Sequence, residues 1–218
     1  MSTKEKRTYV FIDGQNFYLS ARAAFKLNFP NFDARAVGDL LAQKIGGADA
    51  AQVYFYTGMP VAKYSPHWHK FWSNKIAALE EAGVHTFTRP LRYLTETDPS
   101  QPTGYKILNT REKGIDLRIA LDVMEAARRP DCTDIMIVSR DQDFYEVVEK
   151  IDHYCKFEGR DIEVWSAYPD GGNGPKHLRG IDGTRQLRIL RDDYKLCIDP
   201  TDYRNTQKRE PQESIEPA

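Results

Sequence analysis

Four apolar residues, Tyr9–Ile12, run directly into Asp13, and this stretch constrains the fold more than any other. Gly14 follows at once, and Asn16 stands two residues further on. A short continuous apolar run between a polar N-terminus and a glycine is typical of a buried strand in a parallel sheet. Such sheets bind ligands at the carboxyl ends of their strands. Asp13 is therefore predicted to lie where a buried strand meets solvent.

Strand and helix patterns alternate along the chain after this first segment. Each later apolar or alternating run of strand length is separated from the next by residues with helical periodicity. The alternation predicts an α/β protein, a three-layer α/β/α sandwich with a central parallel sheet of about five strands and right-handed crossovers. The predicted strands are residues 9–13, 51–57, 84–88, 134–139 and 161–166.

The predicted domain covers residues 8–198, between two polar ends. Residues 1–7 are expected to fray, and the polar tail 199–218 is expected to be disordered. Within the domain, the proline-containing stretch 89–110 is predicted to be an irregular insertion. It has the pattern of a hairpin in which Leu91–Thr95 pairs with Tyr105–Asn109.

Composition limits the partners and the compartment. The net charge of −1 gives no signal for a nucleic-acid partner, so binding of that kind requires a local basic surface. No apolar run of about 18 residues is present, and no membrane association is predicted. Three cysteines without metal-ligand spacing indicate reduced thiols in a cytoplasmic protein. They are Cys132, Cys155 and Cys197.

Carboxylates from three segments are predicted to meet at one edge of the sheet. Asp13 ends the first strand, Asp141 and Asp143 follow the strand 134–139, and Asp116 opens the helix before that strand. The topological switch point of such a sheet lies beside its first strand, with strand 134–139 as neighbour. Clustered carboxylates repel one another unless a cation neutralises them, and Mg²⁺ prefers oxygen ligands. A metal site there would suit phosphodiester hydrolysis.

Helix capping explains part of the same pattern. Asp13 stands where it can cap the following helix, and Asp143 can cap the next one with Glu146 as its capping-box partner. Asp141 and Asp143 would share a side in an extended segment but diverge once a helix starts, so Asp141 is favoured over Asp143 as a direct metal ligand.

Two further polar residues have more than one interpretation. Asp122 lies roughly 240° around the helix from Asp116, so it is expected to support the site indirectly or to be structural. Asn16 would orient a water or a phosphate, or bond the loop backbone.

Three motifs together resemble a known family and occur in its order over about residues 9–166. They are Phe11–Asn16 (FIDGQN), Glu112–Asp116 (EKGID) with Asp122 beyond it, and Val138–Phe144 (VSRDQDF). This combination resembles the NYN domain, the bacterial LabA-like branch of the PIN-like nuclease superfamily. The resemblance implies a PIN-like fold and a nuclease that depends on Mg²⁺ or Mn²⁺ and acts most often on RNA.

The resemblance also implies roles for residues of the three motifs. The acidic cluster would be Asp13, Asp116, Asp141 and Asp143, with Asn16 and Ser139 lining it. The family usually has a small residue, typically Gly, where Arg140 stands. An arginine there would pair with an acid and weaken metal binding, or contact a phosphate.

The sequence thus favours a metal-dependent ribonuclease that cuts single-stranded RNA, with Asp13 as the central ligand and water as the nucleophile. A non-catalytic module that binds RNA or a protein is the alternative, in which the acids serve capping and solubility. A DNA-directed nuclease is a third hypothesis, because no feature of the sequence identifies a residue that would contact the 2′-hydroxyl of RNA.

Basic residues gather at two places and are candidate phosphate contacts. They flank the insertion and follow the last predicted strand, where residues 176–191 are expected to be partly helical. Phosphate binding by these groups would be salt-sensitive, although an ordinary solvated face explains them as well. The candidates are Arg111, Lys113, Lys176, Arg179 and Arg185.

Aromatic residues offer two further possibilities. Tyr93 and Tyr105 would stack on bases or pack within the hairpin. An exposed apolar face on the helix that carries Trp68 and Trp72 would suit a homodimer, and packing into the core explains it equally well.

Overall fold

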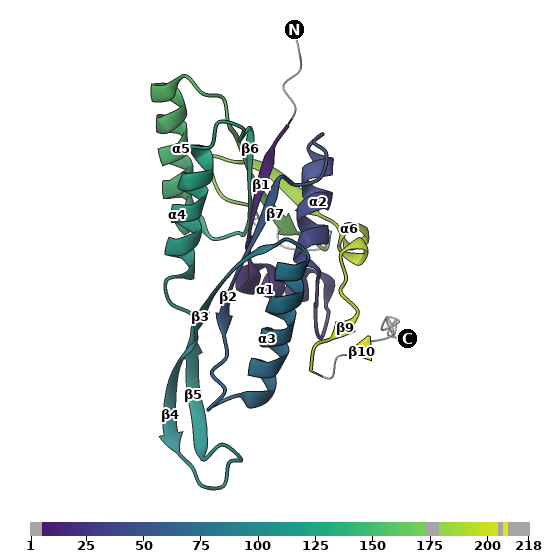
Figure 1. Cartoon of the computed structure of the whole chain (residues 1–218), viewed down its shortest axis with the longest axis vertical. Coiled ribbons are helices and arrows are strands. Elements are labelled where there is room, and N and C mark those ends of the chain that lie inside the picture. Colours follow the sequence, from purple (N-terminus) through teal and green to yellow (C-terminus); the bar gives the residue numbers. More distant parts are fainter. Residues whose placement is uncertain (1–5, 173–178, 205–206, 209–218) are drawn as a thin grey trace.

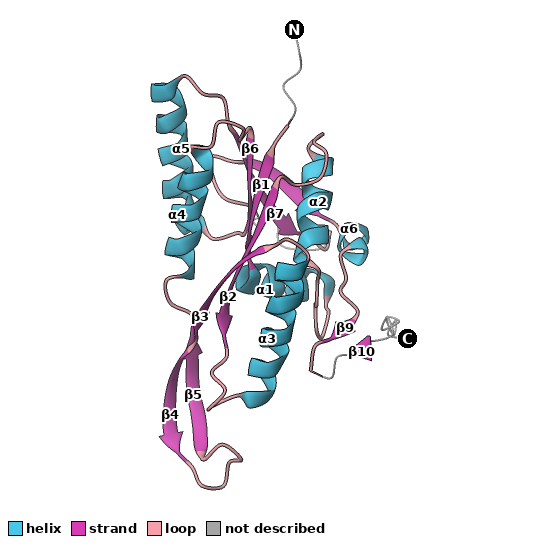
Figure 2. Ribbon diagram, in the orientation of Figure 1, coloured by secondary structure: helices cyan, strands magenta, loops and turns pink. Residues whose placement is uncertain are grey.

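A six-stranded sheet forms the centre of the computed structural model, which describes residues 6–172, 179–204 and 207–208. Every neighbouring pair of strands in this sheet is parallel (Figure 1, Figure 2). The strands are β1 (Thr8–Asp13), β2 (Gln52–Met59), β3 (His85–Pro90), β6 (Asp134–Val138), β7 (Glu163–Pro169) and β8 (Arg185–Ile189). Their order across the sheet is β3-β2-β1-β6-β7-β8. The predicted parallel α/β fold is confirmed, with one strand more than expected.

Helices cover both faces of the sheet (Figure 2). One apolar core lies between the sheet and α1 (Gly14–Phe25), α2 (Ala34–Lys44), α3 (Pro66–Glu81) and α6 (Arg191–Leu196). A second core lies on the opposite face, beneath α4 (Ile115–Ala127) and α5 (Tyr145–Glu158). These are the three predicted layers.

Strand β1 is central because it supplies apolar side chains to both cores. Val10 and Ile12 pack on the α1 side, whereas Tyr9 and Phe11 pack on the α4 side. All six residues of the strand are buried. A strand covered on both faces needs a continuous apolar run, and this explains the pattern that precedes Asp13.

The sixth strand, β8, lies where the sequence suggested a partly helical basic segment. In the described part of that segment, residues 179–190 form no helix, residues 185–189 pair with β7, and α6 begins only at Arg191. β8 is an edge strand in which Ile189 is buried and Leu187 half-buried, while Arg185 and Arg188 are exposed. The alternation of Leu187 and Ile189 was the strand signal, and it was masked by the surrounding basic residues.

The insertion contains the predicted hairpin. β4 (Arg92–Thr97) and β5 (Tyr105–Arg111) pair antiparallel as a separate two-stranded sheet, which extends away from the central sheet in Figure 1. Tyr93 and Tyr105 both pack against Tyr64, with ring centroids 4.8 and 5.4 Å apart. Tyr64 lies in the turn before α3, so both rings pack between the hairpin and that turn instead of within the hairpin.

The first residues of the predicted tail pack against the domain. The backbone carbonyl of Asp199 accepts a hydrogen bond from Asn31, and that of Tyr203 accepts one from Asn74, at 2.9 and 2.8 Å. A short hairpin follows, formed by β9 (Thr201–Asp202) and β10 (Gln207–Lys208). The rest of the predicted tail and residues 1–5 lie outside the described residues.

Two further expectations concerned membrane spans and the cysteines. No helix among the described residues is long and apolar enough to cross a membrane. The three cysteines are free thiols, two of them buried in the core.

Candidate active site

Asp13 lies at the junction of β1 and α1, at the carboxyl edge of the sheet. Its side chain is 5% exposed, and one carboxylate oxygen accepts the Asn16 N–H at 3.0 Å. Asp13 is therefore the cap of α1, as one reading of the sequence proposed. Gly14 permits this tight junction, because a Cβ there would lie 2.7 Å from the Tyr56 carbonyl oxygen.

Ser139 joins the end of β1 to the end of β6. Its hydroxyl donates to the second carboxylate oxygen of Asp13 at 3.2 Å and accepts the Asp141 N–H at 3.2 Å. The backbone N–H of Arg140 donates to the Asn16 side-chain oxygen, also at 3.2 Å. Because β1 and β6 are adjacent, these bonds fasten together the two loops at the topological switch point.

Asp141, rather than Asp143, is the cap of the structure that follows β6. Its carboxylate accepts the Asp143 N–H at 3.0 Å and begins the short 3₁₀ helix η1 (Gln142–Phe144). α5 starts at Tyr145 with no side-chain cap, so the predicted capping box of Asp143 with Glu146 is not formed. The exposed Asp143 carboxylate accepts no hydrogen bond from the described residues.

Asp116 reaches the same region from the first turn of α4. Gly114 precedes the helix with a positive φ of 77°, and this turn brings the chain from β5 into α4. The Asp116 carboxylate is solvent-accessible and has no hydrogen-bond partner among the described residues. The structure thus gathers the three predicted segments at one edge of the sheet.

The pKa values report that these carboxylates influence one another. Burial, followed by the charges of Asp116 and Asp141, raises the pKa of Asp13 to about 6, against the lowering effect of the Asn16 and Ser139 hydrogen bonds. The pKa of Asp116 is raised by burial and then by the charges of Asp141 and Asp143. The site therefore has an excess of negative charge that a cation would relieve.

Glu112 belongs to this cluster, and the sequence reasoning missed it. Its carboxylate accepts the backbone N–H of Gly58 at the end of β2. Burial raises the pKa of Glu112 to about 7, and the charges of Asp13 and Asp116 add to the shift. The sequence did contain a reason to include Glu112 among the site residues, because it is the first residue of one of the three motifs and directly follows the hairpin.

Arg140 turns away from the acids. Its guanidinium lies 5.9 Å from the ring centroid of Tyr168 and donates to the backbone carbonyl of Arg179 at 3.4 Å. Within the described part of the chain it forms no ion pair with an acid of the cluster. The arrangement leaves the carboxylates without an arginine partner from this position.

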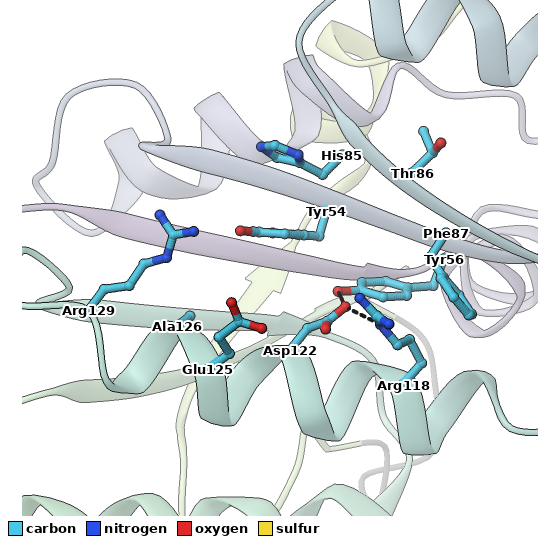
Figure 3. A pocket seen from close by; sticks show the side chains of 10 residues that line it. All are labelled: Tyr54, Tyr56, His85, Thr86, Phe87, Arg118, Asp122, Glu125, Ala126 and Arg129. Carbon is cyan, nitrogen blue, oxygen red and sulfur yellow. Dashed lines mark hydrogen bonds and ion pairs between the residues drawn. The ribbon is translucent and has the colours of Figure 1, made fainter.

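Asp122 lies in a different cavity, of about 240 Å³, on the α4 side of β2 and β3. Figure 3 shows its carboxylate between Tyr56 and Arg118, which donate hydrogen bonds of 2.8 Å each. The guanidinium of Arg118 also lies 4.8 Å from the Phe87 ring centroid. Of the two expectations for Asp122, these contacts match a structural role.

The acids suit a hard divalent cation by their donor chemistry. All are carboxylates, and their unneutralised charge favours a cation. No three His, Cys, Asp or Glu side chains of the described residues converge on a single point that would hold an ion. Mg²⁺ needs only one or two protein carboxylates and keeps several waters, so the residues fit an ion of this kind.

The predicted phosphate contacts are distributed unevenly. Arg111 and Lys113 are exposed on either side of Glu112 and line a groove of about 400 Å³ along the hairpin. Arg179 is exposed near Arg140 and pairs with Asp182. Arg185 begins β8, at the opposite edge of the sheet from the acids, where it pairs with Glu163. Lys176 lies outside the described residues.

A doubly covered parallel sheet with acids at the carboxyl ends of two adjacent central strands defines an α/β protein of PIN-like class. The sequence profile of the NYN domain matches residues 7–174. The chain belongs to the NYN domain family, a PIN-like nuclease family. This confirms the family that the three motifs indicated.

A solved structure shows the same fold. The chain is similar to a protein of unknown function from Vibrio parahaemolyticus RIMD 2210633, with a TM-score of 0.50 and 22% sequence identity. The match covers 89% of this chain and 98% of the Vibrio chain. No curated protein is significantly similar in sequence.

Proposed function

We propose that this protein is a metal-dependent ribonuclease that hydrolyses phosphodiester bonds of single-stranded RNA. The observation that supports it best is that Asp116 and Asp141 lie close enough to Asp13 at the switch point for their charges to raise its pKa, while the charge of Asp141 also raises the pKa of Asp116. Membership of a nuclease family supports the reaction class, and the family favours RNA as substrate.

The carboxylates that hold Mg²⁺ or Mn²⁺ would come from Asp13, Asp116, Asp141 and Asp143. The bound ion would activate a water and stabilise the charge that develops on the phosphate. Water is the nucleophile in this proposal, so no covalent intermediate forms on the protein. Asp13 would be the central ligand, because it is the most buried of these four acids and is fixed by two hydrogen bonds.

The other residues of the site hold the acids and the substrate in place. Ser139 and Asn16 fix the two loops relative to each other, so the carboxylates keep one spacing before substrate arrives. Arg111 and Lys113 stand beside Glu112, where they would hold the phosphates of the incoming strand. Arg140 would contact a phosphate from the other side, since it is not engaged by an acid.

Cleavage of labelled single-stranded RNA by the purified protein tests this proposal. Wild type is compared with Asp13→Asn, each with Mn²⁺ and with EDTA. We expect cutting that requires Mn²⁺ and falls by at least about 100-fold in the variant. A matched single-stranded DNA distinguishes a ribonuclease from a DNA-directed enzyme.

Asp122→Asn is the matched control, because it removes an equal charge from a carboxylate outside the cluster. It should retain cutting. Cutting that survives in Asp13→Asn would point to a contaminant. Absence of cutting by wild type on both RNA and DNA would favour the non-catalytic binding module.

A further inference from the structure

An aromatic cavity adjoins the acid cluster, and no step of the proposed reaction uses it. It encloses about 270 Å³ between the start of α1, the loop after it, the end of β2 and α3. Gly14 and Gln15, the two residues after Asp13, line it together with Glu112. The cavity therefore lies next to Asp13, the most buried acid of the site, less than one helical turn away along α1.

Aromatic rings form the outer wall of this cavity. Trp68 lies 5.9 Å from Phe29 in a stacked arrangement and 5.5 Å from Phe71 edge-on, measured between ring centroids. Trp68 is 39% exposed, although its ring contacts the rings of Phe29 and Phe71. An exposed indole beside a concave surface has a face available for a planar partner.

Polar residues line the cavity as well, among them Thr57, Asn31 and Lys75. The Lys75 ammonium donates to the Asn31 side-chain oxygen and to the Phe32 carbonyl, and the Asn31 amide donates to the Asp199 carbonyl. These two side chains therefore shape the wall, and Thr57 and Gln15 are the polar side chains left to bond a ligand. The exposed side chain of Gln15 stands at the mouth. Aromatic walls with a few hydrogen-bonding groups are what a nucleobase requires, since it has two apolar faces and a polar edge.

We propose that this cavity is a subsite for one base of the nucleic-acid strand, adjacent to the phosphate at the acid cluster. A volume of about 270 Å³ admits a single base with its sugar at the opening. Continuity with Asp13 through Gly14 and Gln15 favours a base of the substrate strand over a second copy of this chain. This rests on the proposed function only in taking a nucleic acid as the ligand.

The subsite requires an unpaired base, because the base has to leave its neighbours to enter the cavity. It therefore explains a single-strand preference by stacking rather than by sequence reading. Aromatic stacking tolerates all four bases, so the preference among them should be modest.

The test uses short single-stranded oligonucleotides in which 2-aminopurine replaces one base at a time. They bind to the Asp13→Asn protein, which retains every residue of the cavity and does not cut. We expect fluorescence quenching several times stronger at one position than at the others. Trp68→Ala should abolish that quenching and weaken binding about 5- to 100-fold, whereas Trp68→Phe should retain most of both.

Phe157→Ala is the control, because Phe157 is an aromatic residue 87% exposed on α5, at the far face of the sheet. It should leave the quenching unchanged. Binding measured by anisotropy without a preferred quenched position, or quenching that survives in Trp68→Ala, would overturn the subsite while leaving nuclease activity standing. A Trp68-dependent dimer without quenching would do the same and assign the cavity to a second copy.

The same experiments would give a different result if the nuclease proposal were wrong and the base subsite correct. Position-specific quenching that needs Trp68, together with no cleavage by wild type in Mn²⁺, would support the base subsite and contradict the nuclease. An oligonucleotide that does not bind at all would contradict both proposals.

Discussion

Asp13 has two roles with opposite effects on stability. As a cap it satisfies a backbone N–H of α1, which stabilises a helix by about 1 kcal/mol. As a buried carboxylate among other acids it is costly, and its pKa of about 6 measures that cost. A residue placed only for capping would not need to be buried beside other carboxylates.

The balance between these roles predicts that Asp13→Asn stabilises the metal-free protein at pH 7.5. Asn caps as well as Asp does, and the variant removes the buried charge. Because folding raises the pKa of Asp13, the contribution of this residue to stability is fully present below about pH 4 and is lost as the pH rises through 6. Urea unfolding should show a gain of about 1–3 kcal/mol at pH 7.5 and none at pH 4.

Asp143→Asn serves as the control for this comparison, because it alters an exposed acid of the same cluster. Its effect at pH 7.5 should stay within about 0.5 kcal/mol. If Asp13→Asn proves less stable than wild type at pH 7.5, the carboxylate contributes more as a hydrogen-bond acceptor than its burial costs.

Single residues differ in how far the sequence could place them. The adjacency of Asp13 and Asp141 follows from the switch-point rule, since it depends only on strand order. Glu112 could not be placed in the same way, because its position depends on how the hairpin returns to the end of β2. Asp141 caps the segment where Asp143 was the predicted cap, because a 3₁₀ turn precedes α5 and no local sequence pattern predicted that turn.

Among the elements, the β4–β5 hairpin connects most directly to function. It carries Arg111 to the edge of the acid cluster and opens a groove that Lys113 completes. Neither side chain forms an ion pair within the described residues. Two free cations next to a carboxylate cluster would hold a phosphate chain near the acids, which otherwise repel it.

This placement predicts that Arg111→Ala with Lys113→Ala weakens binding of single-stranded RNA in EDTA. The loss should be larger at low salt, and the slope of log affinity against log salt should fall by about 0.7 for each phosphate contact removed. Fluorescence anisotropy over a salt series measures both quantities.

Arg185→Ala is the matched control, because Arg185 is also exposed but pairs with Glu163 at the opposite edge of the sheet. The variant should leave affinity and slope unchanged. Equal losses from both sets of variants would indicate a diffuse electrostatic surface instead of a path along the hairpin.

The elements that the sequence predicted best are those with a strong apolar period. β1 and β6 were recognisable in the sequence because strands covered on both faces have continuous apolar runs. α3 was recognisable because Pro66 marks its start and aromatic residues recur at helical spacing. β8 was missed because an edge strand needs few apolar residues, and its basic side chains face solvent. The same exposure makes a strand hard to recognise in any sheet.

At the scale of the whole molecule, the topology explains why the acids gather at one edge of the sheet. β2 and β3 follow β1 in order toward one lateral edge of the sheet, and β6 then pairs with β1 on its other side. The connections after β1 and β6 therefore leave the switch point in opposite directions, and hydrogen bonds join their first residues. The acids come from both connections, so the folded domain brings together what the chain keeps more than 100 residues apart.

Metal binding is the property of the whole molecule that separates the nuclease from the binding module. An ion that binds only the folded state raises its stability, by about 2.7 kcal/mol when its concentration is 100 times the dissociation constant. For a domain of this size that corresponds to a rise in Tm of about 5–10 °C. Thermal unfolding with and without Mn²⁺ should show this shift in the wild type.

Two variants on α4 decide what the shift means, since each replaces one aspartate by asparagine on the same helix. Asp116→Asn should remove most of the shift, because Asp116 lies within reach of the charges of Asp13 and Asp141. Asp122→Asn should retain it, because Asp122 is occupied by Tyr56 and Arg118 in the cavity of Figure 3. If both variants keep the full shift, the ion binds elsewhere, and the acids at the switch point serve the fold instead of a reaction.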